Sequence, residues 1–141
     1  MNNAILIAVI SGALSIIAAS LSFYFTKRHE LKMKWRDEKL NHYKVLFSAL
    51  SDIAVDGMDK EEANRKFSLA TNTIALSASQ EVISALMSFQ DYVKFSNKSQ
   101  TIEEHDRLLK ELLIAVRKDI GLNKRDDPKT FLFHLIGSKP K

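Results

Sequence analysis

Residues 4–25 read AILIAVISGALSIIAASLSFYF, a run of 22 residues without one charged side chain. At a rise of about 1.5 Å per residue, a helix of this length crosses a hydrocarbon core of about 30 Å. We therefore expect residues 1–26 to form a transmembrane anchor. The alternative is a cleaved signal peptide, which typically has a basic N-terminal region and a shorter apolar stretch; here only Met1, Asn2 and Asn3 precede the run.

Aromatic and basic residues follow the run at its C-terminal end. Phe23, Tyr24 and Phe25 are typical of a membrane–water interface. The next residues include Lys27, Arg28, Lys32, Lys34 and Arg36, with Trp35 among them. Because positive residues stay on the cytoplasmic side and none precedes the run, we expect a single-pass protein of the inner (plasma) membrane, with its N-terminus outside and its C-terminal domain cytoplasmic.

The net positive charge is confined to the segment behind the run. Residues 27–44 hold seven Lys/Arg against three Asp/Glu, whereas residues 45–141 hold fourteen of each. A pI of 9.3 therefore does not indicate a nucleic-acid-binding face, and we expect no nucleic-acid partner. We expect the five cations and Trp35 to contact anionic lipid head groups, at about 1 kcal/mol per cation. The alternative for Trp35 is a place in the core of the following domain.

Small side chains recur within the run at spacings of three and four. They form one ribbon on a helix: Ala8, Ser11, Ser15, Ala19 and Ser22. Small ribbons let membrane helices approach closely, which predicts an oligomer that forms through self-association or docking on another membrane protein. The alternative is that lipid simply tolerates Ala and Ser. Because the run holds no ionisable residue, we expect no proton or ion pathway lined by such groups.

The remaining sequence has the composition of a helical protein. The 141 residues include four Gly, two Pro and no Cys. Few breakers favour helices with short connections over a barrel or sandwich, and the lack of Cys excludes disulfides and thiolate metal sites. We expect an all-α fold in which the anchor continues through a basic juxtamembrane stalk at 27–39 into a cytoplasmic four-helix bundle at 40–141, with a short C-terminal helix.

Apolar stripes at helical spacing predict the core of this bundle. No Gly or Pro lies between the apolar run and Gly57, so the first helix is expected to run from the membrane into the bundle. The expected stripes are Leu40, Tyr43, Phe47, Leu50 and Ala54; then Ala63, Phe67, Ala70 and Ile74; then Val82, Leu86, Phe89 and Val93; and last Leu108, Leu109, Leu112, Leu113 and Val116.

Helix ends are marked by capping residues. Asp59 with Glu62 and Thr101 with Glu104 predict capping boxes, in which cap and acid bond reciprocally, and Ser79 predicts a third helix start. The second helix is expected to end near Ser77. Residues 96–99 read as an exposed loop. Gly121 followed by Leu122 predicts a Schellman ending. Asp127 followed by Pro128 predicts a short fifth helix that carries Phe131, Leu132, Leu135 and Ile136 before a polar end.

No constellation of residues in the sequence indicates catalysis. Glu38 and His42 lie four apart, but no second pair completes a metal site, so an ordinary surface pair is expected. His105 and Asp106 are helix neighbours and should point in different directions. There is no Gly-rich phosphate loop, serine elbow or paired Glu-x-x-His motif. We expect no enzyme activity, no metal and no cofactor.

Two segments resemble a known group of proteins. They are SQEVISAL at 79–86 and LIAVRKDIGL at 113–122. They resemble parts of a loose group of small bacterial membrane-anchored helical proteins, a resemblance that implies no activity, cofactor or site residue. By charge alone, Arg117 and Lys118 suit the negative end of the fourth helix, and Asp119 should pair with one of them or with a neighbouring helix. The alternative is that Arg117, Lys118 and Asp119 form an exposed docking surface.

Two classes of function fit this architecture. The first is a membrane-tethered interaction module that binds a protein partner or supports a membrane assembly at the cytoplasmic face. The second is a self-assembling single-span effector, of a pore-forming, toxin or defence type, that oligomerises through the small ribbon. A membrane-tethered enzyme is a third class, which stays open because fold alone does not dictate function. It is less favoured because no constellation of residues in the sequence indicates catalysis.

Overall fold

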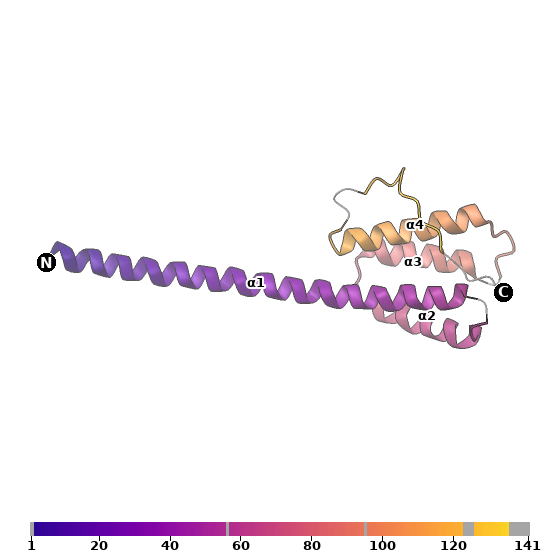
Figure 1. Ribbon diagram of the computed structural model, residues 1–141, viewed down its shortest axis with the longest axis horizontal. Helices are drawn as coiled ribbons and strands as arrows, with labels where there is room; N and C mark the ends of the chain where they lie inside the picture. Colours follow the sequence, from indigo (N-terminus) through magenta and orange to yellow (C-terminus); the bar gives the residue numbers. More distant parts are fainter. Residues whose placement is uncertain (1, 56, 95, 123–125, 136–141) are drawn as a thin grey trace. The chain divides into compact units, whose positions relative to one another are not determined.

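The computed structural model describes residues 2–55, 57–94, 96–122 and 126–135, and this part of the chain contains helices and no strand (Figure 1). The helices are α1 (Asn3–Ala54), α2 (Lys60–Ile74), α3 (Gln80–Val93) and α4 (Ile102–Asp119). The all-α prediction is confirmed, and so is the single helix that runs from the apolar residues into the bundle. By internal contacts the chain divides into two compact units, Met1–Asp37 and Glu38–Lys141, within α1.

The first unit is a single helix. All of its described side chains, at 2–37, are exposed. The helix passes through Gly12 without a break, and a Cβ added there would meet no other atom within 4 Å. An α-helix makes its backbone hydrogen bonds internally, so this segment needs no neighbour to satisfy its polar groups.

The second unit has one hydrophobic core built from all four helices. Helix α1 packs with α2, and α3 packs with α4. The core includes Tyr43, Leu46, Ala49 and Leu50 of α1; Phe67, Ala70 and Ile74 of α2; Val82, Leu86 and Phe89 of α3; and Leu108, Leu109, Leu112 and Val116 of α4.

The predicted stripes are confirmed on α2, α3 and α4 apart from their edges, since Val93 and Leu113 are only partly buried. On α1 the prediction missed two core residues. Leu46 is fully buried and Ala49 nearly so, whereas the predicted Phe47 and Ala54 lie at the edge of the core. The buried face of α1 therefore shares Tyr43 and Leu50 with the predicted stripe, but it also includes Leu46 and Ala49 beside them.

The turn between α1 and α2 explains why α1 ends where it does. Gly57 has a φ of +83°, which glycine adopts without steric cost. Lys60, the first residue of α2, donates from Nζ to the carbonyls of Ile53 and Val55 at 2.7 and 2.6 Å. A cation at this position satisfies the unpaired carbonyls at the negative end of α1.

The predicted N-caps are confirmed, but the reciprocal halves of both capping boxes are wrong. The Asp59 side chain accepts from the backbone N–H groups of Glu61 and Glu62, and Ser79 accepts from Val82. The Glu62 carboxylate instead pairs with Arg65 at 2.8 Å, because an arginine three residues on offers a charged, two-pronged donor. Helix α2 ends at Ile74, and a turn continues to Ser77.

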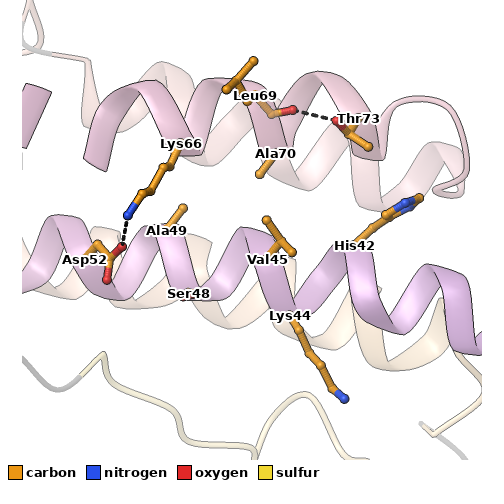
Figure 2. Close-up of a pocket in the computed structure, with 10 residues that line it drawn as sticks. All are labelled: His42, Lys44, Val45, Ser48, Ala49, Asp52, Lys66, Leu69, Ala70 and Thr73. Atoms are coloured by element: carbon orange, nitrogen blue, oxygen red, sulfur yellow. Dashed lines mark hydrogen bonds and ion pairs between the residues drawn. The ribbon is translucent and has the colours of Figure 1, made fainter. Parts of the chain in front are cut away.

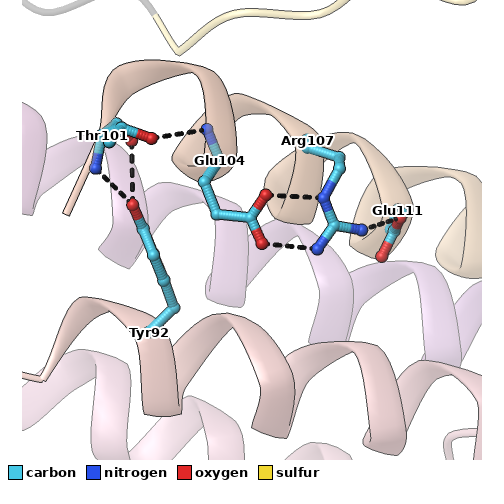
Figure 3. Close-up of polar contacts among 5 residues, drawn as sticks. All are labelled: Tyr92, Thr101, Glu104, Arg107 and Glu111. Carbon is cyan, nitrogen blue, oxygen red and sulfur yellow. Dashed lines mark hydrogen bonds and ion pairs between the residues drawn. The ribbon is translucent and has the colours of Figure 1, made fainter. Parts of the chain in front are cut away.

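The start of α4 is tied to α3 through a tyrosine (Figure 3). Thr101 caps α4 by accepting from the Glu104 N–H at 3.2 Å. Its own backbone N–H donates to the Tyr92 hydroxyl, which in turn donates to the Thr101 carbonyl at 3.0 Å. Glu104 pairs with Arg107, which also reaches Glu111. Tyr92 therefore takes the role that the predicted capping box gave to Glu104.

Helix α4 ends as predicted. Gly121 has a φ of +76°, its N–H donates to the Lys118 carbonyl at 3.0 Å, and the Leu122 N–H donates to the Arg117 carbonyl at 2.7 Å. These two bonds define a Schellman motif, and they require a left-handed residue where Gly121 stands.

The predicted fifth helix is wrong for the residues described. A single turn forms at 128–130, and 131–135 has no regular structure. The Asp127 side chain accepts from the Lys129 N–H and the Thr130 hydroxyl, so it closes a local turn rather than opening a helix. Phe133 and Leu135 pack on the core from this extended segment, while Ile136 and the polar end lie outside the described residues.

Candidate functional site

The first unit carries many exposed large apolar side chains. Its helix is long and apolar enough to cross a membrane, and none of the apolar window is buried within the protein. A core helix of a water-soluble domain would be covered on at least one side. An uncovered apolar helix near the N-terminus is instead typical of a membrane anchor or a signal sequence. Side chains such as Ile16, which is 70% exposed, are left largely uncovered by the described residues.

The predicted ribbon lies on this helix with all of its side chains exposed. Its residues are Ala8, Ser11, Ser15, Ala19 and Ser22. The Ser15 hydroxyl donates to the Ser11 carbonyl at 2.9 Å, four residues back. This bond satisfies the Ser15 hydroxyl inside the helix, so this side chain can face lipid or a second helix without an unpaired donor. Association through the ribbon remains a prediction.

The basic segment behind the apolar run is exposed as well. Lys27 pairs with Glu30 at 2.9 Å, a contact between two exposed side chains that stabilises little. Trp35 is 61% exposed and does not belong to the hydrophobic core, so the alternative of a place in the core of the following domain is wrong. The other predicted head-group contacts, Arg28, Lys32, Lys34 and Arg36, are exposed too. Contact with lipid head groups remains a prediction.

A buried polar cluster joins α1 to the end of α4. The Tyr43 hydroxyl donates to Asp119 Oδ2, and Lys39 Nζ donates to Asp119 at 3.0 and 3.1 Å. The Asp119 side chain is 8% exposed. Burial opposes its ionisation, but hydrogen bonds from Tyr43 and Lys39 and the charge of Lys39 outweigh burial, so the pKa of Asp119 lies below its ordinary value. Burial, and then the bond to Asp119, raise the pKa of Tyr43.

The three residues predicted as a docking surface make contacts within the second unit. Asp119 pairs with a neighbouring helix, which was one of the two roles expected for it. Arg117 forms a two-pronged pair with Asp126 at 2.7 and 3.0 Å and lies over the Phe131 ring. Lys118 reaches Glu81 on α3 at 2.6 Å between exposed side chains. Binding of a partner at these residues remains a prediction.

A groove between α1 and α2 is the feature that sequence reasoning missed (Figure 2). Its volume is about 620 Å³. Ala49 and Ala70 are buried between the two helices, while Val45 and Leu69 are 57% and 54% exposed. The signal was present in the sequence, because Val45 and Leu69 are large apolar residues that fall off the predicted stripes.

Polar side chains mark the ends of this groove. Lys66 on α2 reaches Asp52 on α1 at 3.5 Å, as Figure 2 shows. At the other end, His42 Nδ1 lies 3.1 Å from the Ser77 hydroxyl. His42 therefore contacts the turn that follows α2, and it lines the groove.

The other histidines correct one further expectation. His105 Nδ1 lies 3.4 Å from the Asp106 carboxylate, so these helix neighbours do meet, and His134 contacts the same carboxylate. The hydrogen bond from His134 is the largest effect that lowers the pKa of Asp106. His105 also meets the Phe89 ring edge-on, with centroids 5.3 Å apart. Within the described ranges, no three His, Cys, Asp or Glu side chains are arranged to hold a metal ion.

Comparison of the chain with protein-family models, with curated proteins and with solved structures gives no match. The resemblance of residues 79–86 and 113–122 to small bacterial membrane-anchored proteins therefore stays an expectation. Two surfaces of the described residues bear on function: the apolar helix of the first unit and the groove of the second.

Proposed function

We propose that the protein is a single-pass, membrane-tethered helical interaction module. In this proposal residues 1–26 anchor the chain in the inner membrane, with the N-terminus outside. The second unit then binds a protein partner, or supports a membrane assembly, at the cytoplasmic face. The observation that carries the proposal is the helix at 4–25, which has no charged and no buried side chain. Apolar surface of this extent is stable in lipid and not in water.

The basic segment supports the orientation. Five cations follow the apolar run: Lys27, Arg28, Lys32, Lys34 and Arg36. Anionic lipids on the cytoplasmic leaflet attract such residues, and Trp35 has the amphipathic ring that favours the interface. A cleaved signal sequence would separate the run from these cations, so the two readings differ in what remains attached to the mature chain.

The second unit supports the binding half of the proposal. Its buried polar side chains tie helices together, as in the cluster of Lys39, Tyr43 and Asp119. Exposed apolar side chains at Val45 and Leu69 line an open groove framed by polar residues. Apolar patches with polar rims typically mark protein-protein contacts.

A pair of C-terminal reporters tests the orientation. Fused to the full chain, a fluorescent protein that matures in the cytoplasm should be bright, and alkaline phosphatase, which is active only after export, should be silent. A matched variant moves the charge: Asn2→Lys and Asn3→Lys, with Arg28→Gln, Lys32→Gln, Lys34→Gln and Arg36→Gln, should reverse the outcome. Phosphatase activity from the unchanged chain would refute the cytoplasmic placement.

The ribbon of small residues favours a second candidate, a self-assembling effector. Its five side chains lie exposed on one side of α1, where a second copy could pack closely. The triple substitution Ser11→Leu, Ser15→Leu and Ala19→Leu should abolish self-association in this case. Ala13→Leu with Ser20→Leu, which places two added leucines on the opposite side of the helix, is the control. Unchanged stoichiometry in the triple variant would rule out assembly through the ribbon.

A further inference from the structure

The groove between α1 and α2 has a shape and lining that suit the binding of apolar side chains. Small residues make its floor, because Ala49 is 2% exposed and Ala70 is 5% exposed where the two helices meet. Val45 rises on the α1 side and Leu69 on the α2 side, both more than half exposed. A volume of about 620 Å³ is enough for several large apolar side chains, and no described part of the chain covers it.

The charges around the groove are unequal. Asp52 is the one acid that lines it, and this carboxylate already pairs with Lys66. Lys44 is exposed at the edge, and no ion pair to it occurs within the described residues. The groove thus offers an apolar floor with one positive charge at its edge, that of Lys44, which has no ion pair within the described residues.

We propose that this groove binds an amphipathic helix of another protein, one with acidic residues beside its apolar stripe. An amphipathic helix sets apolar side chains at i, i+3 or i+4 and i+7 into such a channel between two helices. Acidic side chains on its flank would meet Lys44. A second copy of this groove would instead bring another excess of cations, so charge complementarity favours a foreign partner. The inference rests on the proposed role as an interaction module and names the surface and the partner chemistry.

Site-specific photocrosslinking in the native host tests this inference on the full-length chain. Benzoylphenylalanine replaces Val45 or Leu69 in separate variants, and replaces Ile102, which is 78% exposed on α4, as the control. We expect both groove positions to crosslink the same foreign protein through an amphipathic segment rich in Asp and Glu, and the control position not to do so. A crosslink to a second copy, or to a basic or non-helical segment, would overturn the proposal.

A charge reversal distinguishes specific binding in the groove from nonspecific apolar association. Lys44→Glu should lower the crosslinking yield at Leu69 about tenfold, because it would face the acids of the partner. Lys129→Glu, an equal reversal at an exposed site away from the groove, should leave the yield unchanged. Equal yields in the two variants would overturn the charge argument. If Ile102 alone captures a foreign protein, the groove inference fails and the interaction module survives; if no position captures one, both fail.

Discussion

The two parts of helix α1 differ in how their side chains are exposed and buried. In the first unit every described side chain is exposed, and apolar residues occur on all sides of the helix. In the second unit the same helix buries Tyr43, Leu46, Ala49 and Leu50 on one side and exposes Lys44 and Ser48 on the other. The pattern of side chains, and not the backbone, decides whether a segment needs lipid or a protein core.

The largest expected effect comes from placing charge in the first half of α1. Leu14→Asp with Ile17→Asp should abolish membrane retention, because each carboxylate near the centre of a span costs about 3 kcal/mol. Retention is measured as the share of chain left in the membrane pellet after an alkaline carbonate wash. The control is Leu14→Ala with Ile17→Ala, which keeps the segment uncharged. Full retention of the aspartate variant would contradict the anchor.

Truncating one leucine in each half of α1 sharpens the contrast. Leu46→Ala should lower the free energy of unfolding of the second unit by about 3 kcal/mol, since Leu46 is fully buried in the core. Leu14→Ala should change it by less than about 0.5 kcal/mol, because Leu14 is 60% exposed and belongs to the first unit. Urea titrations of the full chain in mild detergent, followed by circular dichroism, measure both. Equal losses would contradict the division into two units.

The buried cluster at Asp119 should give a smaller effect that depends on pH. Asp119→Asn should lower the free energy of unfolding by about 2 kcal/mol at neutral pH, because Tyr43 and Lys39 lose a charged acceptor. The folded pKa of Asp119 lies below its ordinary value of 3.8, so the folded state binds fewer protons than the unfolded one. The stabilisation is therefore complete well above pH 3.8 and is lost as pH falls through the lower, folded pKa.

Unfolding titrations of wild type and Asp119→Asn between pH 7 and pH 3 check this sign. The difference between the two proteins should shrink as the pH falls toward the acid limit. Tyr43→Phe, which removes one donor and keeps the ring, should cost about 1 kcal/mol and leave the Lys39 pair in place. A difference between wild type and Asp119→Asn that grows on acidification would show that the carboxylate is not stabilised in the folded state.

The same substitution at two glycines gives the smallest contrast. Gly121→Ala should cost the second unit about 1 kcal/mol, because its φ of +76° strains any residue with a Cβ, even though that Cβ would meet no atom within 4 Å. Gly12→Ala should leave the unfolding of the second unit unchanged, since Gly12 lies in the helix of the first unit. Thermal unfolding of both variants is the measurement. Identical midpoints would contradict the Schellman ending.

Sequence patterns predicted most of the helices because their ends carry local signals. Asp59, Ser79 and Thr101 each bond to the backbone within three residues, and such bonds depend on nothing distant. Gly121 is a local signal of the same kind. The failures arose where a distant or competing partner decided the outcome: Tyr92, nine residues away, bonds the Thr101 backbone, and Asp127 closes a turn rather than a helix.

The candidate site was less accessible to sequence reasoning. The apolar helix and its cations are continuous stretches, so both could be read directly. The groove is built by residues from two helices, and pairing Val45 with Leu69 requires the packing of α1 on α2. Lys39 and Asp119 are likewise 80 residues apart in sequence, so their pairing could be expected only as a contact with some neighbouring helix.

Native mass spectrometry of the protein, extracted from its host membranes in mild detergent, tests the central claim most directly. The account predicts a chain that still carries residues 4–25, in a defined complex with a different protein. A chain that has lost its N-terminal run would contradict the anchor. A discrete homo-oligomer without another protein would contradict the interaction module and favour the self-assembling effector.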